Sequence, residues 1–249
     1  MTPEHCAALL RRGDPDRFAS TMAAEPRDRA RLATLYAANL EIARAAIASA
    51  EPLISQMRLQ WWADQIARMA GGHAPAAHEI ASPLFDAWGA AIAPLGDIVE
   101  ARHRDALREP FTDEAAVLAH IDACTGTLMR LAAGACGLDG QDGLIADQAR
   151  GAGLAAWLGA YPRLRTLNLG LAGDSPAALG WLAQSGLSGL DHARTHSPRP
   201  PRRAAPALFA GAGARAALCA ARHGKQAGIS EFRRKLSYAA LAGFGRWQG

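Results

Sequence analysis

The sequence has 249 residues, of which 50% are apolar and 20% are charged, and its formal net charge is +4. A chain of this length and apolar content can bury a large core, which excludes an intrinsically disordered protein. Alanine and leucine are abundant, whereas Ile, Val, Thr and Tyr, which favour strands, are scarce. The composition therefore predicts an all-α protein.

The first predicted helix has Thr2 as its N-cap and ends at Gly13, and Pro26 begins a longer helix. The apolar stripe of this longer helix includes Asn39. Because a buried Asn needs polar partners, we expect Asn39 to line a cavity or a helix contact. Further helices are expected at about residues 54–69, 79–107 with a break near Pro94, 112–137, 142–162, 205–223 and 229–247.

A segment rich in Pro and Arg, which includes "SPRPPRRAAP", predicts a long exposed connection at about residues 185–206. We expect residues 1–249 to form a single domain that contains this connection. The sequence has no run of 18 apolar residues, and its N-terminus lacks the pattern of a signal peptide. We therefore expect a cytoplasmic protein.

The cysteines Cys6, Cys124, Cys136 and Cys219 are widely spaced and form no C-x-x-C pair. This spacing argues against a zinc knuckle and against a disulfide framework. We expect four separate buried thiols.

The C-terminal quarter is strongly basic, because residues 186–249 hold 11 Lys and Arg against 2 Asp and Glu. Aromatic and basic side chains alternate there, namely Phe232, Tyr238, Phe244 and Trp247 with Arg233, Arg234, Lys235 and Arg246. One interpretation is a solvated, arginine-rich surface. The other is a basic aromatic helix that makes a peripheral contact with an anionic membrane. We do not expect nucleic acid as a partner.

The segment "RLQWW", Arg58 to Trp62, lies in the predicted helix at residues 54–69. Trp62 shares a helix face with Leu59 and Met69, whereas Trp61 lies on the face of Met57, about 100° away. This helix is apolar over a wide arc. The spacing of its apolar residues alone therefore predicts that the Trp pair packs in the core and that the helix lies between two other helices.

Residues 16–66 also carry a series of motifs: Tyr36-Ala37, Asn39, Glu41 to Arg44, Glu51-Pro52 and Arg58 to Trp62. With these motifs the block resembles the squalene/phytoene synthase family. Weaker, collinear similarity continues at Gly153-Leu154-Ala155 and in "ISEFRRKLSYAALAGFGRW" near the C-terminus. The resemblance implies an isoprenoid (terpenoid) synthase-like helical bundle around a central cavity.

Active members of this family join two prenyl diphosphates head to head, and two Asp-rich motifs hold the Mg²⁺ ions that neutralise the leaving diphosphate. This sequence departs from both motifs. The acidic positions of the first motif correspond to Ala43, Arg44 and Ile47, and residues 151–173, where the second would lie, contain no Asp or Glu. We therefore expect no metal, no cofactor and no catalytic residue.

Without Mg²⁺, a bound diphosphate would depend on arginine, which can bind phosphate with two parallel hydrogen bonds. The candidate ligand-binding residues, expected to line the cavity, are Tyr36, Asn39, Arg44, Arg58, Trp61, Trp62, Arg163 and Arg165.

The family branch with the Arg-Leu-Gln-Trp-Trp block resembles the mitochondrial assembly factor for respiratory complex I, which also lacks the Asp motifs. This resemblance implies a non-catalytic protein at the inner face of the inner membrane. Its partner would be a respiratory-complex subunit, an isoprenoid or an anionic lipid. The alternative is an active prenyl transferase of the phytoene or squalene synthase type that uses Mg²⁺ with displaced ligands.

Three other patterns carry less weight. His192 and His196 have the spacing of a metal pair but run into the predicted connection, so a surface role is expected. His120 and Cys124 have the same spacing inside a predicted core helix, where we expect them to pack. The glycines near residue 211 lack the strand that a dinucleotide site requires.

Overall fold

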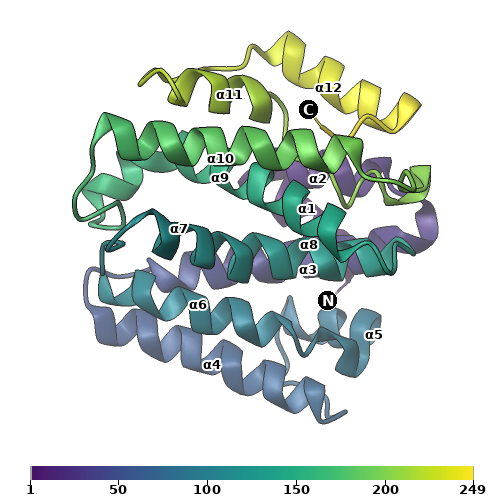
Figure 1. Ribbon diagram of the computed structural model, residues 1–249. Coiled ribbons are helices and arrows are strands. Elements are labelled where there is room, and N and C mark those ends of the chain that lie inside the picture. Colours follow the sequence, from purple (N-terminus) through teal and green to yellow (C-terminus); the bar gives the residue numbers. More distant parts are fainter. Residues whose placement is uncertain (1, 249) are drawn as a thin grey trace. The chain divides into compact units, whose positions relative to one another are not determined.

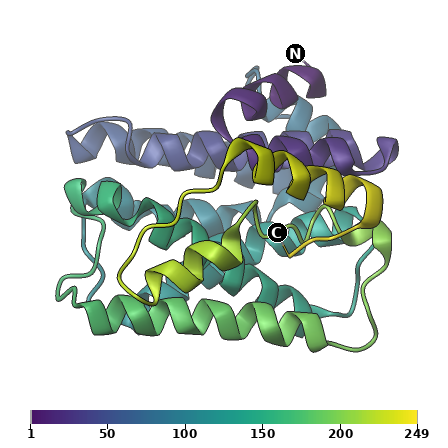
Figure 2. The same ribbon diagram turned by 90° about the horizontal axis from the view of Figure 1, so that it is seen from above.

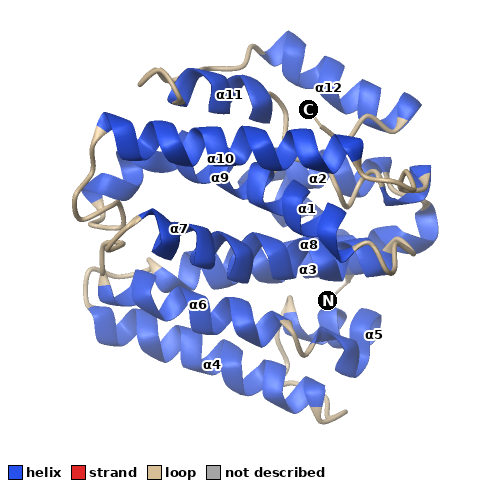
Figure 3. Ribbon diagram, viewed as in Figure 1, coloured by secondary structure: helices blue, strands red, loops and turns tan. Residues whose placement is uncertain are grey.

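The computed structural model describes residues 2–248. Helices make up most of this part of the chain, and its only strand-like pairing is an isolated bridge between Phe111 and Leu171 (Figure 3). The predicted all-α class is confirmed. The chain divides into two compact units, Met1–Glu109 and Pro110–Gly249. The expectation of a single domain stays a prediction.

Unit 1 is built around one long helix, α3, which packs against α1, α2, α4, α5 and α6. Within the unit, α4 and α6 lie side by side (Figure 1). Its helices are α1 (Pro3–Gly13), α2 (Pro15–Ala23), α3 (Pro26–Ala46), α4 (Pro52–Ala70), α5 (Ala81–Trp88), the 3₁₀ turn η1 (Gly89–Ile92) and α6 (Leu95–Leu107).

Proline begins four of the helices of unit 1, where its missing N–H costs no intrahelical hydrogen bond. The core contains Leu32 and Leu35 from α3 and Leu59 and Met69 from α4, all fully buried. Trp62 is also buried, at 4% exposure. The predicted core face of the "RLQWW" helix is therefore confirmed.

Unit 2 is dominated by two long antiparallel helices, α9 and α10. In the view from above, α11 lies beside α10, and the two helices are in contact (Figure 2). The helices of unit 2 are α7 (Glu114–Ile121), the π-helical turn η2 (Asp122–Gly126), α8 (Thr127–Ala135), α9 (Asp142–Thr166), α10 (Pro176–Thr195), the 3₁₀ turn η3 (Arg202–Ala204), α11 (Ala214–Ala221) and α12 (Glu231–Phe244).

Side-chain caps fix where several helices of unit 2 begin. The side chains of Asp113, Ser175 and Ser230 accept hydrogen bonds from backbone N–H groups in the first turns of α7, α10 and α12. Such caps each stabilise a helix by about 1 kcal/mol. The cap of α7 is thus Asp113, one residue after the helix start expected at residue 112.

Glycines let α9 and α10 approach closely. A Cβ atom on Gly189 would lie 2.6 Å from the carbonyl oxygen of Asp147, and one on Gly151 would lie 2.9 Å from the carbonyl oxygen of Gly186. Both distances are shorter than a real contact allows, and the opposing atoms belong to the backbone. Only glycine therefore permits this helix spacing without a shift of the backbone.

Some expected boundaries are wrong. The patterns did not reveal α2 or α10, and because α10 extends to Thr195, the Pro/Arg-rich connection begins at His196 rather than near residue 185. In α9 the helix continues past Pro162 to Thr166. The helix expected at 205–223 is only Ala214–Ala221, because Gly211 and Gly213 have φ angles of 98° and 77° that interrupt it.

We expect Gly189→Ala to lower the free energy of unfolding by about 1–3 kcal/mol, because the added methyl collides with backbone. The matched control is Gly159→Ala, in an open, exposed position of α9. This control should be stabilising by up to about 1 kcal/mol, as expected for Gly to Ala in a helix. Urea unfolding followed by circular dichroism measures both, and equal effects of the two substitutions would contradict the packing argument.

Candidate functional site

Two of the predicted ligand-binding residues lie on α3. Tyr36 is buried, at 5% exposure, and the guanidinium carbon of Arg17 in α2 lies 5.1 Å from the centre of its ring. This distance allows a cation–π contact that holds α2 against α3. Asn39 is half-buried rather than interior, so its amide does not require a buried polar partner.

The C-terminal end of α3 is basic. Arg44 is exposed, and its Nη1 lies 2.8 Å from the Glu41 carboxylate oxygen Oε1. Nearby, Nη2 of Arg108 donates to the backbone oxygen of Ser49 at 2.9 Å. Cations are favourable at this end of a helix because the macrodipole is negative there.

This end of α3 does not fit Mg²⁺, which requires several oxygen ligands in octahedral geometry. Ala43 and Ile47 offer no side-chain oxygen, and Arg44 brings a positive charge instead. The one acidic side chain within this turn, Glu41, is already paired with Arg44.

The Trp pair of α4 forms an aromatic cluster with His78. The ring centres of Trp61 and Trp62 are 5.1 Å apart with planes at 84°, and His78 lies 4.7 Å from Trp61 and 5.5 Å from Trp62. Nδ1 of His78 accepts hydrogen bonds from the backbone N–H groups of Ile80 and Ala81, at 3.2 and 3.3 Å. Burial lowers the pKa of His78, which favours the neutral imidazole. The contacts of Trp61 and Trp62 with His78 thus hold the segment between α4 and α5 in place.

The rest of the "RLQWW" helix faces solvent. Arg58 is exposed, and Trp61 is half-buried. The first turns of α4 also expose the large apolar side chains of Leu53 and Met57, at 67% and 65%. The face shared by Trp61 and Met57 is therefore an exposed surface and not part of the core.

In unit 2, Arg163 and Arg165 lie in the last turns of α9 and are exposed. Arg165 forms an ion pair with Asp174, and the hydroxyl of Tyr161 donates to the same carboxylate at 3.0 Å. The hydrogen bond to Asp174 raises the pKa of Arg165, and burial raises the pKa of Tyr161. Asp174, the nearest carboxylate after α9, is thus neutralised by an arginine.

Other carboxylates of unit 2 also have basic side chains as partners. Asp122 lies 2.6 Å from Arg150, and Asp147 lies 3.1 Å from Nε2 of His196. Across residues 2–248, no group of three or more His, Cys, Asp or Glu side chains is arranged to hold a metal ion. The donors in unit 2 therefore do not fit Mg²⁺ either.

The remaining histidine and cysteine patterns have structural roles. Sγ of Cys124 lies 3.8 Å from Nε2 of His120, whose ring stacks edge-on against Phe111. His192 and His196 make no metal pair, because His196 contacts Asp147. Cys6, Cys124, Cys136 and Cys219 form no disulfide. Cys6, Cys124 and Cys136 are buried as expected, and burial raises the pKa of Cys6 to about 11, but Cys219 is exposed, so the prediction is wrong for that residue.

The basic C-terminal helix α12 exposes large apolar side chains. Phe232 and Phe244 are 76% and 77% exposed, and Leu236 is 58% exposed. Tyr238 is half-buried against Phe209, with ring centres 6.3 Å apart. Helix α12 thus combines apolar and cationic groups on its surface. Within the described residues, no helix is both long and apolar enough to cross a bilayer.

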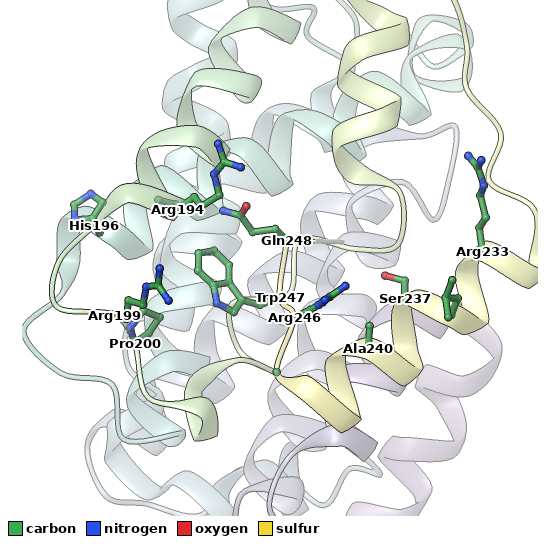
Figure 4. Close-up of a pocket in the computed structure, with 13 residues that line it drawn as sticks. Arg194, His196, Arg199, Pro200, Arg233, Ser237, Ala240, Arg246, Trp247 and Gln248 are labelled. Carbon is green, nitrogen blue, oxygen red and sulfur yellow. The ribbon is translucent and has the colours of Figure 1, made fainter.

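A pocket of about 730 Å³ lies in unit 2 between the end of α10, the segment after it, α12 and the C-terminal tail (Figure 4). Arg194, Arg199, Arg233 and Arg246 contribute to its lining. No sequence pattern predicted this site, because its residues come from segments far apart in the chain. The only signal for it was the excess of positive charge after residue 186.

Comparisons with known proteins agree with this helical architecture. The family model described as squalene/phytoene synthase matches residues 10–158, which is more than half of the chain. Among solved structures, a dehydrosqualene synthase crystallised in complex with a ligand is similar, with a TM-score of 0.68 and 14% sequence identity over 97% of this chain and 95% of that chain. A comparison with curated proteins gives no match. The structural similarity confirms the predicted isoprenoid synthase-like fold, and the family match shows that this chain belongs to the squalene/phytoene synthase family.

Proposed function

We propose that this chain keeps the scaffold of its family without the Mg²⁺-dependent joining of prenyl diphosphates, and that it acts as a non-catalytic binding protein. The observation that carries the proposal is the missing set of carboxylates. The acidic positions of the first motif correspond to Ala43 and Arg44 in α3 and to Ile47 just after it, and the part of α9 from Gly151 to Thr166 contains no Asp or Glu.

The chemistry of the reaction explains why this loss matters. Ionising an allylic diphosphate places a large negative charge on the leaving group, which divalent cations stabilise in the transition state. Removing those cations loses transition-state stabilisation on the order of several kcal/mol, which is among the largest electrostatic contributions in catalysis. Arginines such as Arg44 and Arg163 can hold a phosphate group, but they do not replace several divalent ions.

The partners that we propose are an isoprenoid or anionic lipid, or a subunit of a respiratory complex, as in the branch of the complex I assembly factor. Of the predicted ligand-binding residues, the exposed arginines of each unit are those that we propose for contacts with an anionic group: Arg44 and Arg58 in unit 1, and Arg163 and Arg165 in unit 2. The exposed Phe232 and Phe244 on the basic helix α12 support a peripheral contact with the inner face of the inner membrane.

Pyrophosphate release is the direct test of the missing reaction. With farnesyl or geranylgeranyl diphosphate and Mg²⁺, we expect no release above the rate without protein, because the carboxylates that would hold the ions are absent. The assay needs an active synthase of the same family as its positive control. Turnover that EDTA abolishes would overturn this proposal and establish the rival function, an active prenyl transferase with displaced metal ligands.

Sedimentation with liposomes tests the membrane contact. We expect the protein to bind vesicles that contain phosphatidylglycerol, to bind neutral phosphatidylcholine vesicles several-fold more weakly, and to be released as salt rises, because screening weakens the attraction. The double variant Phe232→Ser and Phe244→Ser should lower binding several-fold.

The matched control for sedimentation is the double variant Leu53→Ser and Met57→Ser, which removes two similarly exposed apolar side chains from α4. It should leave sedimentation unchanged. Absence of binding at low salt, or an equal loss in both double variants, would contradict a membrane contact through α12.

A further inference from the structure

We propose that the pocket between α10, α12 and the C-terminal tail binds one phosphate-headed amphiphile, with the phosphate at its arginines and the aliphatic chain along its apolar wall. This inference deepens the proposed lipid-binding function and rests on it. The residues that line the pocket lie between Ala193 and Gln248, outside the segment 10–158 that matches the family.

Backbone hydrogen bonds hold the tail that forms one wall of the pocket. The chain reverses after α12 at Gly245, whose φ of 65° is readily available to glycine. The N–H of Arg246 then donates to the oxygen of Ala240 at 3.2 Å, and the oxygen of Trp247 accepts from the N–H of Ala210 at 3.0 Å.

A third bond ties the end of the tail to α10, because Nε2 of Gln248 donates to the oxygen of Leu190 at 2.8 Å. In Figure 4, Arg246 and Trp247 lie between α12 and the segment of Arg199 and Pro200. The wall is thus formed before any ligand arrives, which lowers the entropic cost of binding.

The charge of the pocket points to an anion. Four arginines and one histidine line it, and none of the described lining residues is acidic. Arg199 and Arg233 are exposed and form no ion pair with a carboxylate of residues 2–248. Arg246 stacks on Phe244, with its guanidinium carbon 5.9 Å from the ring centre.

Arg194 is only weakly engaged by its nearest carboxylate. Its Nη2 lies 3.7 Å from Asp191, and the same carboxylate oxygen lies 2.7 Å from Nη2 of Arg215. The hydrogen bond from Arg215 lowers the pKa of Asp191, so this carboxylate is already satisfied. Guanidinium groups of this kind can donate paired hydrogen bonds to a phosphate, and a bound phosphate would offset part of the positive charge of the lining.

The apolar part of the lining distinguishes an amphiphile from a free phosphate ion. On α12, Arg233, Leu236 and Ala240 are spaced so that they share one face, and all three line the pocket. Leu236 is 58% exposed, and Trp247 of the tail adds a half-buried apolar surface. Head-group contacts and chain contacts therefore come from the same wall.

The size of the pocket agrees with this ligand. A volume of about 730 Å³ lies within the range of about 300–1,000 Å³ that is typical of small-molecule sites. A nucleotide would fit the phosphate contacts, but its base would need hydrogen-bond partners, and the amide of Gln248 already donates to Leu190.

The test is isothermal titration calorimetry of the full chain with monomeric decyl phosphate, below its micelle concentration. We expect one site per chain and an affinity at least tenfold higher than for inorganic phosphate. Adenosine monophosphate and the uncharged decyl maltoside serve as comparison probes and should bind at least tenfold more weakly than decyl phosphate. Equal or tighter binding of inorganic phosphate, the nucleotide or the uncharged detergent would overturn the proposal.

Two variants locate the site. Arg233→Gln should weaken decyl phosphate binding about tenfold, the usual size of one lost charge-assisted hydrogen bond. Leu236→Gln should weaken binding of decyl phosphate but not of inorganic phosphate. Both side chains are exposed, so neither change should alter the thermal unfolding of the protein.

The matched control is Lys225→Gln, which removes one exposed positive charge from the same region but lies outside the pocket. Equal weakening by Lys225→Gln and Arg233→Gln would refute the site, because it would reflect general charge attraction. Vesicle sedimentation without decyl phosphate binding would refute the pocket and leave the membrane contact standing. Decyl phosphate binding together with Mg²⁺-dependent turnover would retain the pocket and refute the proposed function.

Discussion

The close approach of α9 and α10 is the constraint on which unit 2 depends. Gly189 faces the backbone of Asp147, so these two helices pack with little side-chain volume between them. This contact fixes the direction of α10 and therefore the place where it ends. Leu190, one residue after the contact, accepts the hydrogen bond from Gln248 that anchors the C-terminal tail. The helix spacing thus also determines where the arginine-lined pocket forms.

A second feature of the structure is that arginine side chains pair with carboxylates near the ends of α3 and α9. A metal-dependent synthase needs carboxylates free to bind cations, but here Glu41 is paired with Arg44, and Asp174 is paired with Arg165. An arginine beside a carboxylate supplies the positive charge that a metal ion would otherwise bring. These pairs place guanidinium groups at the ends of α3 and α9, and such groups can also bind anions.

Local patterns predicted the helices well where capping and apolar spacing agreed. Pro26 marked the start of α3, and Leu59, Trp62 and Met69 were correctly placed on the core face of α4. The prediction failed at α10, although Ser175 and Pro176 carry the usual signals for a helix start. Gly186 and Gly189 lower the intrinsic helix propensity of this segment, and the packing against α9 and α11 that requires them is invisible in a single sequence.

The sequence by itself determined the helical class, the family and the absence of acidic residues from 151 to 173, because composition, motifs and residue identity are local properties. Only the tertiary structure decided which charges are already paired and which arginines line the same pocket. Arg194, Arg199, Arg233 and Arg246 belong to separate segments, and they line one pocket because Gly245 reverses the tail and hydrogen bonds tie it to Ala210 and Leu190. Such long-range contacts depend on the packing of whole helices, which no local pattern records.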